Sequence, residues 1–292
     1  MDLEIASDIH GHTHFSDGRA TPEEYIDFRR SLGLRLVAVA DHDIFTAVPA
    51  ASRAAARAGM WFLPAAEITS FLHFGTTEAE QVHVLAYFPP SFANAARLSR
   101  TALHKRSLLV LARWKAFVLD WLASLPAEDR RALDPDADLA ALPDAAFPAL
   151  QTFIDRICAA RRPLFDPFRL HHVRVWEGDR ELFGWTPEEA MEAIRADGAL
   201  DVVAHAGRYR DKERTRKALL HASGVEVYTS RHRAEVAEGY LAFARERDKH
   251  WTASSDDHQN ARYARPPRGT PVRTVERLFG RSLSTDEIHR RA

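Results

Sequence analysis

Hydrophobic residues recur in short blocks along the first ninety positions, and the spacing within each block predicts one strand or one helix. Residues 21–33 have the apolar spacing of a helix that begins at the capping sequence Thr21-Pro22-Glu23-Glu24 and ends at Gly33. A second helix is predicted over residues 51–59. Strands are predicted at residues 3–9, 34–40, 61–63 and 82–88. Strands that alternate with helices predict a parallel sheet with the helices outside it.

The apolar pattern becomes helical after residue 90. Residues 91–167 are rich in Ala, Arg and Leu at helical spacing, with breaks rich in Pro and Asp around residues 134–144. The helix-start sequence returns at Thr186-Pro187-Glu188-Glu189. Further strands are predicted at residues 201–204, 224–228, 240–248 and 251–254. We therefore expect an α/β barrel built from residues 1–90 and 185–292, with residues 91–184 as a mostly helical insertion that caps it.

Potential metal ligands stand where the predicted strands end. His10 and His12 are separated by one residue, so both imidazoles face the same side of a strand. In parallel barrels the chemistry lies at the carboxyl ends of the strands. Such ends carry His10, His12, His42, Glu67, His205, Asp256 and His258, whereas His83 stands near the start of its strand. This mixture of imidazole and carboxylate suits divalent manganese, iron or zinc.

The composition narrows the kinds of partner. Forty basic and forty-one acidic residues give a net charge of −1, so no overall field favours nucleic acid or an anionic membrane. The lone Cys158 excludes an intramolecular disulfide and a cysteine metal cage, so a metal must take nitrogen and oxygen ligands. Charged residues interrupt the longest apolar stretch, at residues 107–125, so we expect no membrane span. We expect no signal peptide, a cytoplasmic location and no obligate protein partner.

Six segments together carry a resemblance to a known family. They are Asp8-Ile9-His10-Gly11-His12-Thr13 leading into Ser16-Asp17-Gly18, Ala40-Asp41-His42-Asp43, Ala66-Glu67-Ile68, Val82-His83-Val84-Leu85, Val203-Ala204-His205-Ala206-Gly207-Arg208-Tyr209, and Ser255-Asp256-Asp257-His258. With them the chain resembles the polymerase and histidinol phosphatase (PHP) family of metal-dependent phosphoesterases, over residues 1–90 and 185–260. It is most similar to the group that acts on nucleoside monophosphates, nucleoside bisphosphates and short RNA ends.

The resemblance implies a distorted (β/α)7 TIM-like barrel that binds three divalent ions. One ion would be bound by His10, His12, Glu67 and Asp256, a second by Glu67, His83 and His205, and a third by Asp17, His42 and His258. Glu67 would bridge two ions. His42, Glu67 and Asp256 would serve catalysis, in which a metal-bound hydroxide hydrolyses a phosphate ester of a small nucleotide-like substrate or an RNA end.

Arg208 is the candidate for a phosphate clamp, because it follows His205 closely and a guanidinium matches phosphate oxygens in a planar fork. Arg231 and His232 are further candidates for substrate binding. Ala206 replaces the usual proline of this segment and Asp257 replaces an aromatic residue, and the insertion lacks an Arg-Thr-His-Phe-like segment. These departures leave the substrate and the role of Asp257 open.

Other conspicuous residues have ordinary structural explanations. Asp41 and Asp43 are expected to form turns or to support the ligands. The helical spacing of Trp114, Phe117, Trp121 and Leu122 predicts core packing within the insertion rather than a platform for bases. No ligand position is assigned to His14, His73, His171, His172, His221 and His289.

Two other functions remain open. A metal-dependent hydrolase of C–N bonds would use the same activated water, and a neutral, apolar pocket would favour it. A non-catalytic barrel that binds metal or nucleotide is the second alternative, although a structural ion needs fewer ligands than this chain offers. Arginines around the pocket would favour a phosphate ester.

Overall fold

The computed structural model describes residues 3–261 and 266–289. Its strands are β1 (Glu4–Ile5), β2 (Ser7–Asp8), β3 (Leu36–Val39), β4 (Trp61–Leu72), β5 (Glu80–Tyr87), β6 (Leu200–Val203), β7 (Gly224–Tyr228), β8 (His250–Ala253) and β9 (Thr270–Pro271). The helices that accompany them are α1 (Pro22–Ser31), α2 (Val48–Arg57), α3 (Ala95–Leu98), α9 (Pro187–Ala196), α10 (Lys212–His221), α11 (Ala234–Glu246), α12 (Val272–Phe279) and α13 (Thr285–His289).

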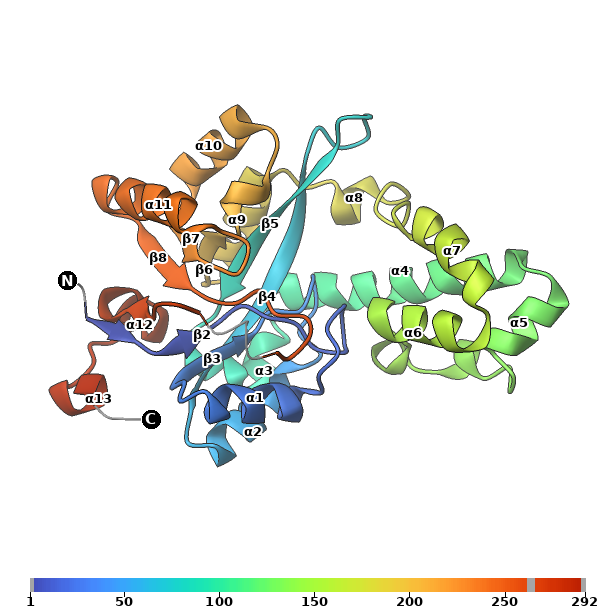
Figure 1. Ribbon diagram of the computed structural model, residues 1–292, viewed down its shortest axis with the longest axis horizontal. Coiled ribbons are helices and arrows are strands. Elements are labelled where there is room, and N and C mark those ends of the chain that lie inside the picture. Colours follow the sequence, from blue (N-terminus) through green and yellow to red (C-terminus); the bar gives the residue numbers. More distant parts are fainter. Residues whose placement is uncertain (1–2, 262–265, 290–292) are drawn as a thin grey trace.

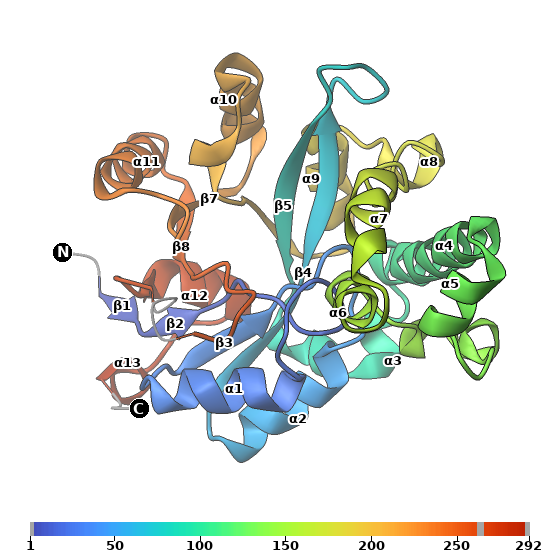
Figure 2. The same cartoon turned by 45° about the vertical axis from the view of Figure 1, so that its right-hand side comes forward.

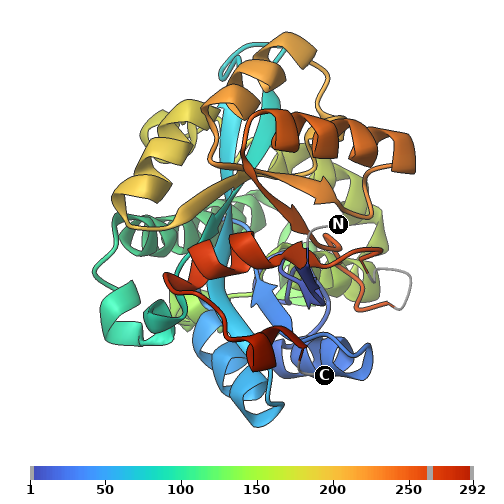
Figure 3. The ribbon, with the colours of Figure 1, turned by 90° about the vertical axis from the view of Figure 1, so that its left-hand side faces the viewer.

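Seven strands form one sheet in the order β2-β3-β4-β5-β6-β7-β8. The sheet curls until its two edges meet, where Gly11 and Asp257 form a parallel bridge and the His12 amide donates to the Asp257 carbonyl at 3.0 Å. Helices surround this closed sheet (Figure 3). The predicted distorted (β/α)7 barrel is therefore confirmed.

Strand β5 departs from the expected parallel arrangement, because it pairs antiparallel with both β4 and β6. Residues 73–79 alone connect β4 to β5, and so short a link produces a hairpin, whereas a parallel crossover needs a dozen residues or more. The reversal explains His83. Near the start of an antiparallel strand, it lies at the same barrel end as residues at the ends of parallel strands, and its carbonyl accepts from the Ala204 amide.

Two predicted strands were wrong in extent or type. Strand β4 runs far beyond residue 63, so Glu67 lies within it and not after it. Pro64 pairs with Val39 of β3 inside the ladder and does not end the strand. Residues 240–248 fall largely in helix α11, whose buried Ala237, Leu241 and Ala244 follow helical spacing.

The chain between β5 and α9 is helical and projects to one side of the barrel (Figures 1 and 2). Its helices are α4 (Ala102–Ser124), α5 (Ala127–Leu133), α6 (Leu150–Ala160), α7 (Phe165–His172) and α8 (Arg180–Phe183), with short 3-10 turns at Pro90–Ala93, Leu139–Ala141, Asp144–Ala146 and Arg162–Leu164. Trp121 and Leu122 lie in an apolar core of this region, with Trp114 and Phe117 packed against it, as predicted. No helix in the described ranges is long and apolar enough to cross a membrane.

A buried arginine ties the barrel edges together. Arg29 of α1, 1% exposed, donates from Nε to Asp8 at 3.1 Å and from Nη2 to Asp257 at 2.8 Å. Asp8 also accepts from the amide and hydroxyl of Ser255. Asp257 further accepts from the backbone amides of residues 259–261. Asp257 therefore holds the loop after β8 in place.

Arg29→Met is expected to lower the free energy of unfolding by about 3–5 kcal/mol, because it leaves two buried carboxylates without their cation. Chemical denaturation of the metal-free protein measures this change. Arg30→Met is the matched control, because Arg30 is exposed on the same helix. Equal stability of the two variants would contradict this role of Arg29.

Candidate metal centre

All nine predicted ligands meet at one end of the barrel. They are His10, His12, Asp17, His42, Glu67, His83, His205, Asp256 and His258. They come from the ends of β2, β3, β6 and β8, from the loops that follow these strands, and from the middle of β4 and the first half of β5. Residues from both ends of the chain thus surround one small volume.

Glu67 occupies the middle of this cluster and is fully buried. Its Oε2 lies 3.2 Å from His10 Nε2, 3.3 Å from His12 Nε2 and 3.3 Å from His42 Nδ1. Its Oε1 lies 3.0 Å from both His83 Nδ1 and His205 Nε2. One carboxylate therefore faces five imidazoles, three at one oxygen and two at the other.

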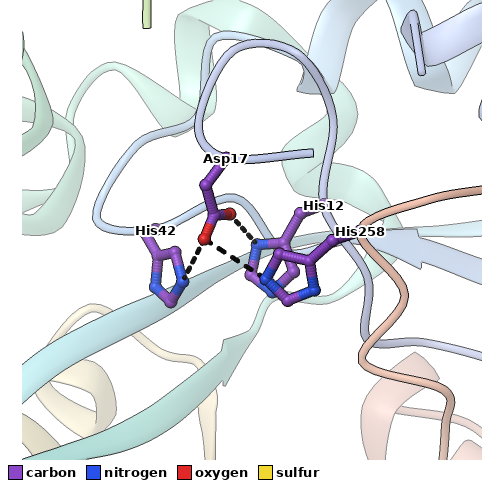
Figure 4. Close-up of side chains that lie close together, drawn as sticks. All are labelled: His12, Asp17, His42 and His258. Carbon is purple, nitrogen blue, oxygen red and sulfur yellow. Dashed lines mark ion pairs between the residues drawn. The ribbon is translucent and has the colours of Figure 1, made fainter. Parts of the chain in front are cut away.

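The remaining carboxylates extend the cluster on either side of Glu67. Asp17 Oδ2 lies 3.2 Å from His258 Nε2 and 3.5 Å from His42 Nε2, and Asp17 Oδ1 lies 3.6 Å from His12 Nδ1 (Figure 4). Asp256 Oδ1 lies 3.4 Å from His12 Nε2 and 3.7 Å from His10 Nε2. Imidazoles thus stand between carboxylates throughout the site.

Two features of the cluster fit divalent cations: the distances between its nitrogen and oxygen atoms, and the buried atoms that lack a hydrogen-bond partner. Nitrogen and oxygen ligands about 2.0–2.2 Å from one ion lie roughly 3–3.6 Å from each other, which is the spacing seen here. His10 Nε2, both ring nitrogens of His12 and Glu67 Oε2 are buried without a hydrogen-bond partner among the described residues. Leaving buried polar atoms unpaired is costly. The residues therefore fit metal ions, and groups of three or four potential ligands overlap across the whole cluster.

The backbone at the ligands is held in uncommon conformations. His205 and Asp256 both have positive φ, 30° and 53°, which non-glycine residues rarely adopt. Gly18 follows Asp17, and a Cβ there would lie 2.3 Å from the His12 carbonyl oxygen, so only glycine lets the Asp17 loop fold over His12. Such strain is concentrated at functional sites.

Several supporting residues were not predicted from the sequence. Glu226 of β7 is fully buried, lies 2.9 Å from His10 Nδ1 and accepts from the His205 amide and the Ser254 hydroxyl. A carboxylate behind a ligand histidine fixes the ring and its tautomer. The available signal was a single charged residue inside an otherwise apolar strand.

The residues flanking His42 are also anchored. Asp41 accepts from the amide and hydroxyl of Thr13 and from Ser16, so it supports the loop that carries Asp17. Asp43 accepts from the Thr69 amide at 3.0 Å and from Arg106 at 2.6 Å. Arg106 belongs to α4 and is buried, so the helical region reaches the metal centre through this ion pair.

The charges at the centre shift several pKa values. Burial lowers the pKa of His12 and His42, but the neighbouring carboxylates, Asp17 foremost, together outweigh burial and raise both pKa values to about 9. Burial raises the pKa of Glu67, yet the surrounding charged imidazoles hold it well below its usual value. The carboxylates are therefore ionised, and protons and metal ions compete for the same imidazoles.

The three predicted substrate-binding residues lie in different positions. Arg231 donates from Nε to Asp256 at 2.5 Å, and Arg208 Nη1 lies 3.9 Å from the same carboxylate. Their side chains are 38% and 49% exposed. His232 Nε2 accepts from the Gly207 amide and its Nδ1 lies 2.9 Å from the Val227 carbonyl, so its ring holds the segment that carries Arg208.

The centre opens into a cavity of about 610 Å³, within the size range of small-molecule sites. Asp17, His42, His83, His205 and His258 line its inner end together with Arg208 and Arg231. His172, to which no ligand role was assigned, lines the cavity too. Residues of α4 and of the segment after α7 form much of the outer wall.

Metal binding to the metal-free protein is expected to release protons. His12 and His42 carry protons below about pH 9, whereas an imidazole must be neutral to bind an ion. Affinity should therefore rise between about pH 7 and pH 9. Calorimetric titration with Mn²⁺ in buffers of different ionisation enthalpy measures the protons released. Affinity that is independent of pH over this range would contradict the assignment.

Arg106→Met is expected to leave Asp43 buried without its cation and to lower the free energy of unfolding by about 3–5 kcal/mol. Because Asp43 adjoins His42, manganese affinity should fall as well. Lys105→Met is the control, since Lys105 is exposed on the same helix. Thermal unfolding and metal titration measure both effects, and unchanged affinity in a folded Arg106→Met protein would contradict the coupling.

Comparisons with known proteins agree with the metal centre described above. Residues 8–127 match the family model described as PHP domain. The chain is 24% identical over 267 residues to the 5'-3' exoribonuclease Rnm of Salmonella typhimurium and to that of Escherichia coli, and each alignment covers 87% of this chain and 86% of the relative.

Two solved structures share the fold. A protein from Bifidobacterium adolescentis, described as a metal-dependent phosphoesterase, has 24% identity and a TM-score of 0.63, with 98% of this chain and 99% of that chain covered. An amidohydrolase from Chromobacterium violaceum with bound sulfate has 21% identity and a TM-score of 0.60, with 93% and 96% covered. The resemblance that the motifs carry is thus confirmed over residues 8–127, which match the PHP domain model, and the two solved structures show that the chain shares their fold.

Proposed function

We propose that this protein hydrolyses a phosphate ester of a small nucleotide-like substrate or an RNA end, using divalent ions held by the nine ligands. The observation that carries the proposal is the position of Glu67, which faces five imidazoles while two arginines stand at the edge of the same cavity. Such ions, when bound, lower the pKa of a coordinated water so that it can act as a nucleophile, and they neutralise phosphate oxygens.

We propose three ions of manganese, iron or zinc with the ligand sets implied by the family resemblance. The contacts support Glu67 as the ligand shared between the first and second sets, because its two oxygens face different histidines. They also bring His12 close to Asp17, His42 and His258, so the first and third sets adjoin.

The proposed catalytic residues His42, Glu67 and Asp256 have distinct surroundings. His42 is partly exposed to the cavity and lies between Asp17 and Glu67. Asp256 accepts from Arg231 and thereby orients that guanidinium toward the inner end of the cavity. Glu67 is buried beneath both, so it keeps the imidazoles together rather than contacting the substrate's organic part.

Arg208 and Arg231 are the proposed phosphate-binding residues. One guanidinium group can donate two parallel hydrogen bonds to two oxygens of a phosphate, and it retains its charge at all physiological pH values. Both side chains line the cavity and are partly exposed, so an incoming anion can reach them. A direct substrate contact by His232 stays a prediction, since its contacts favour support of the Arg208 segment.

Residues 91–184 are proposed as a cap subdomain that shapes access to the centre. Helix α4 contributes both the Arg106 anchor and cavity-lining residues, which supports that role. The named activity of the Rnm relatives supports RNA ends and nucleotides as the first substrates to test. The cytoplasmic location and the lack of an obligate protein partner stay predictions.

Hydrolysis of a C–N bond is the second candidate, and the apolar outer wall of the cavity favours it. The arginines at the inner end favour phosphate. A panel of phosphate esters and amides with the same aromatic group would separate the two reactions. Faster cleavage of the amides would overturn the phosphoesterase proposal.

Asp256→Asn tests the metal-dependent mechanism. Asparagine tolerates the positive φ of this position, so the variant removes charge without forcing the backbone. Mutation of a residue that only hydrogen-bonds to a metal ligand typically lowers activity by roughly 10–100-fold. The rate of phosphate release by Asp256→Asn should fall by more than that, because Asp256 is a proposed ligand itself. Metal content is measured alongside. Full activity at unchanged metal content would show that the mechanism is wrong.

Arg208→Ala should lower kcat/KM by about 10–1,000-fold and leave the metal content unchanged, because the side chain contacts substrate rather than ions. Arg210→Ala is the matched control, since Arg210 is 73% exposed and pairs with Glu80. Steady-state phosphate release gives both values. Equal losses in the two variants would contradict a phosphate clamp at Arg208.

A further inference from the structure

The cavity has two chemically different ends. The inner end carries the metal ligands with Arg208 and Arg231. The outer wall is apolar and includes Val110, Leu111, Trp114, Phe147, Val175 and Trp176. These side chains come from α4, from the segment before α6 and from the segment after α7, so three parts of the helical region contribute to one wall.

The outer wall offers no cation for a second anionic group. Among the described residues that line the cavity, Arg208 and Arg231 are the only ones with a lysine or arginine side chain. Both lie beside Asp256. The outer titratable groups are the exposed carboxyl side chain of Glu177 and the imidazole of His172, whose pKa is lowered by burial. A phosphate placed there would lose water without gaining a charged partner, which is costly.

The aromatic side chains of the wall are held in place by other residues, and part of each ring surface remains accessible from the cavity. Trp114 donates from Nε1 to the Pro148 carbonyl at 2.9 Å, which fixes the indole while its ring borders the cavity. Trp176 packs edge-on against Phe183 with centroids 4.8 Å apart. Both indoles are only partly buried. Fixed aromatic surfaces of this kind bind flat rings by stacking or edge contacts.

From these contacts we propose that the preferred substrate carries a single phosphate on a flat, uncharged ring-bearing group. The phosphate lies at the inner end near Arg208 and Arg231, and the ring lies against Trp114 and Trp176. A second phosphate on the same molecule is disfavoured. This inference rests on the proposed phosphoesterase function and narrows its substrate class.

The test compares kcat/KM of the manganese-loaded protein on matched phosphate esters. The first pair is 1-naphthyl phosphate and glycerol phosphate. The second comparison sets adenosine 5'-monophosphate against adenosine 3',5'-bisphosphate and against a short 5'-phosphorylated RNA. We expect 1-naphthyl phosphate to be preferred over glycerol phosphate by about 10-fold or more. Adenosine 5'-monophosphate should be preferred over the bisphosphate and over the RNA by about 100-fold. Preference for the bisphosphate, the RNA or glycerol phosphate would overturn the inference.

Variants of the wall separate binding from folding. Trp114→Ala should raise KM for 1-naphthyl phosphate but not for glycerol phosphate, and Trp114→Phe should restore most of the difference. Leu111→Lys places a cation in the wall and should raise relative activity on the bisphosphate. Leu109→Lys is the control on the same helix, since Leu109 is 61% exposed and lies outside the lining.

The outcomes distinguish the two proposals. Phosphate released from the panel with the reverse ranking would overturn the single-phosphate inference alone. No phosphate released from any ester at full manganese occupancy would overturn the proposed function, and the inference with it. A Trp114→Ala variant that changes KM equally for both members of the first pair would exclude ring contact at this wall.

Discussion

Glu67 is a fully buried carboxylate whose neighbours are five imidazoles, and the rest of the site follows from the need to balance its charge. Without metal ions, protons must supply the positive charge, and the raised pKa values of His12 and His42 reflect that substitution. Protons satisfy this cluster incompletely, since several ring nitrogens and one Glu67 oxygen remain without hydrogen-bond partners among the described residues. Bound divalent ions would satisfy the same atoms and would neutralise the carboxylates as well.

The barrel and its helical insertion both depend on ion pairs that lead to this centre. Arg29 joins Asp8 to Asp257 where the sheet closes, directly behind His10 and Asp256. Arg106 joins α4 to Asp43 beside His42. The same α4 carries Leu111 and Trp114 into the cavity wall. The cavity wall and the placement of His42 are therefore linked through one helix.

Seven of the nine candidate ligands were predictable because they occur near the ends of apolar blocks, and parallel strands bring such ends together. Asp17 and His83 were predicted from the family resemblance. The direction of β5 was not predictable, because it depends on the short link at residues 73–79 and on pairing with both neighbours. Glu226 and Arg106 were missed for a related reason. Their roles arise from contacts with residues 216 and 63 positions away, and neither belongs to a recognisable motif. The apolar character of the cavity likewise appears only once α4 and the segment after α7 fold against the barrel.

The most direct measurement is anomalous scattering from crystals grown with manganese. The account predicts more than one peak around Glu67, each about 2.0–2.3 Å from nitrogen or oxygen atoms of His10, His12, His42, His83 or His205. At least one ion should contact both Glu67 and a second carboxylate. Crystals with manganese only at surface residues, and none within ligand distance of Glu67, would contradict the account.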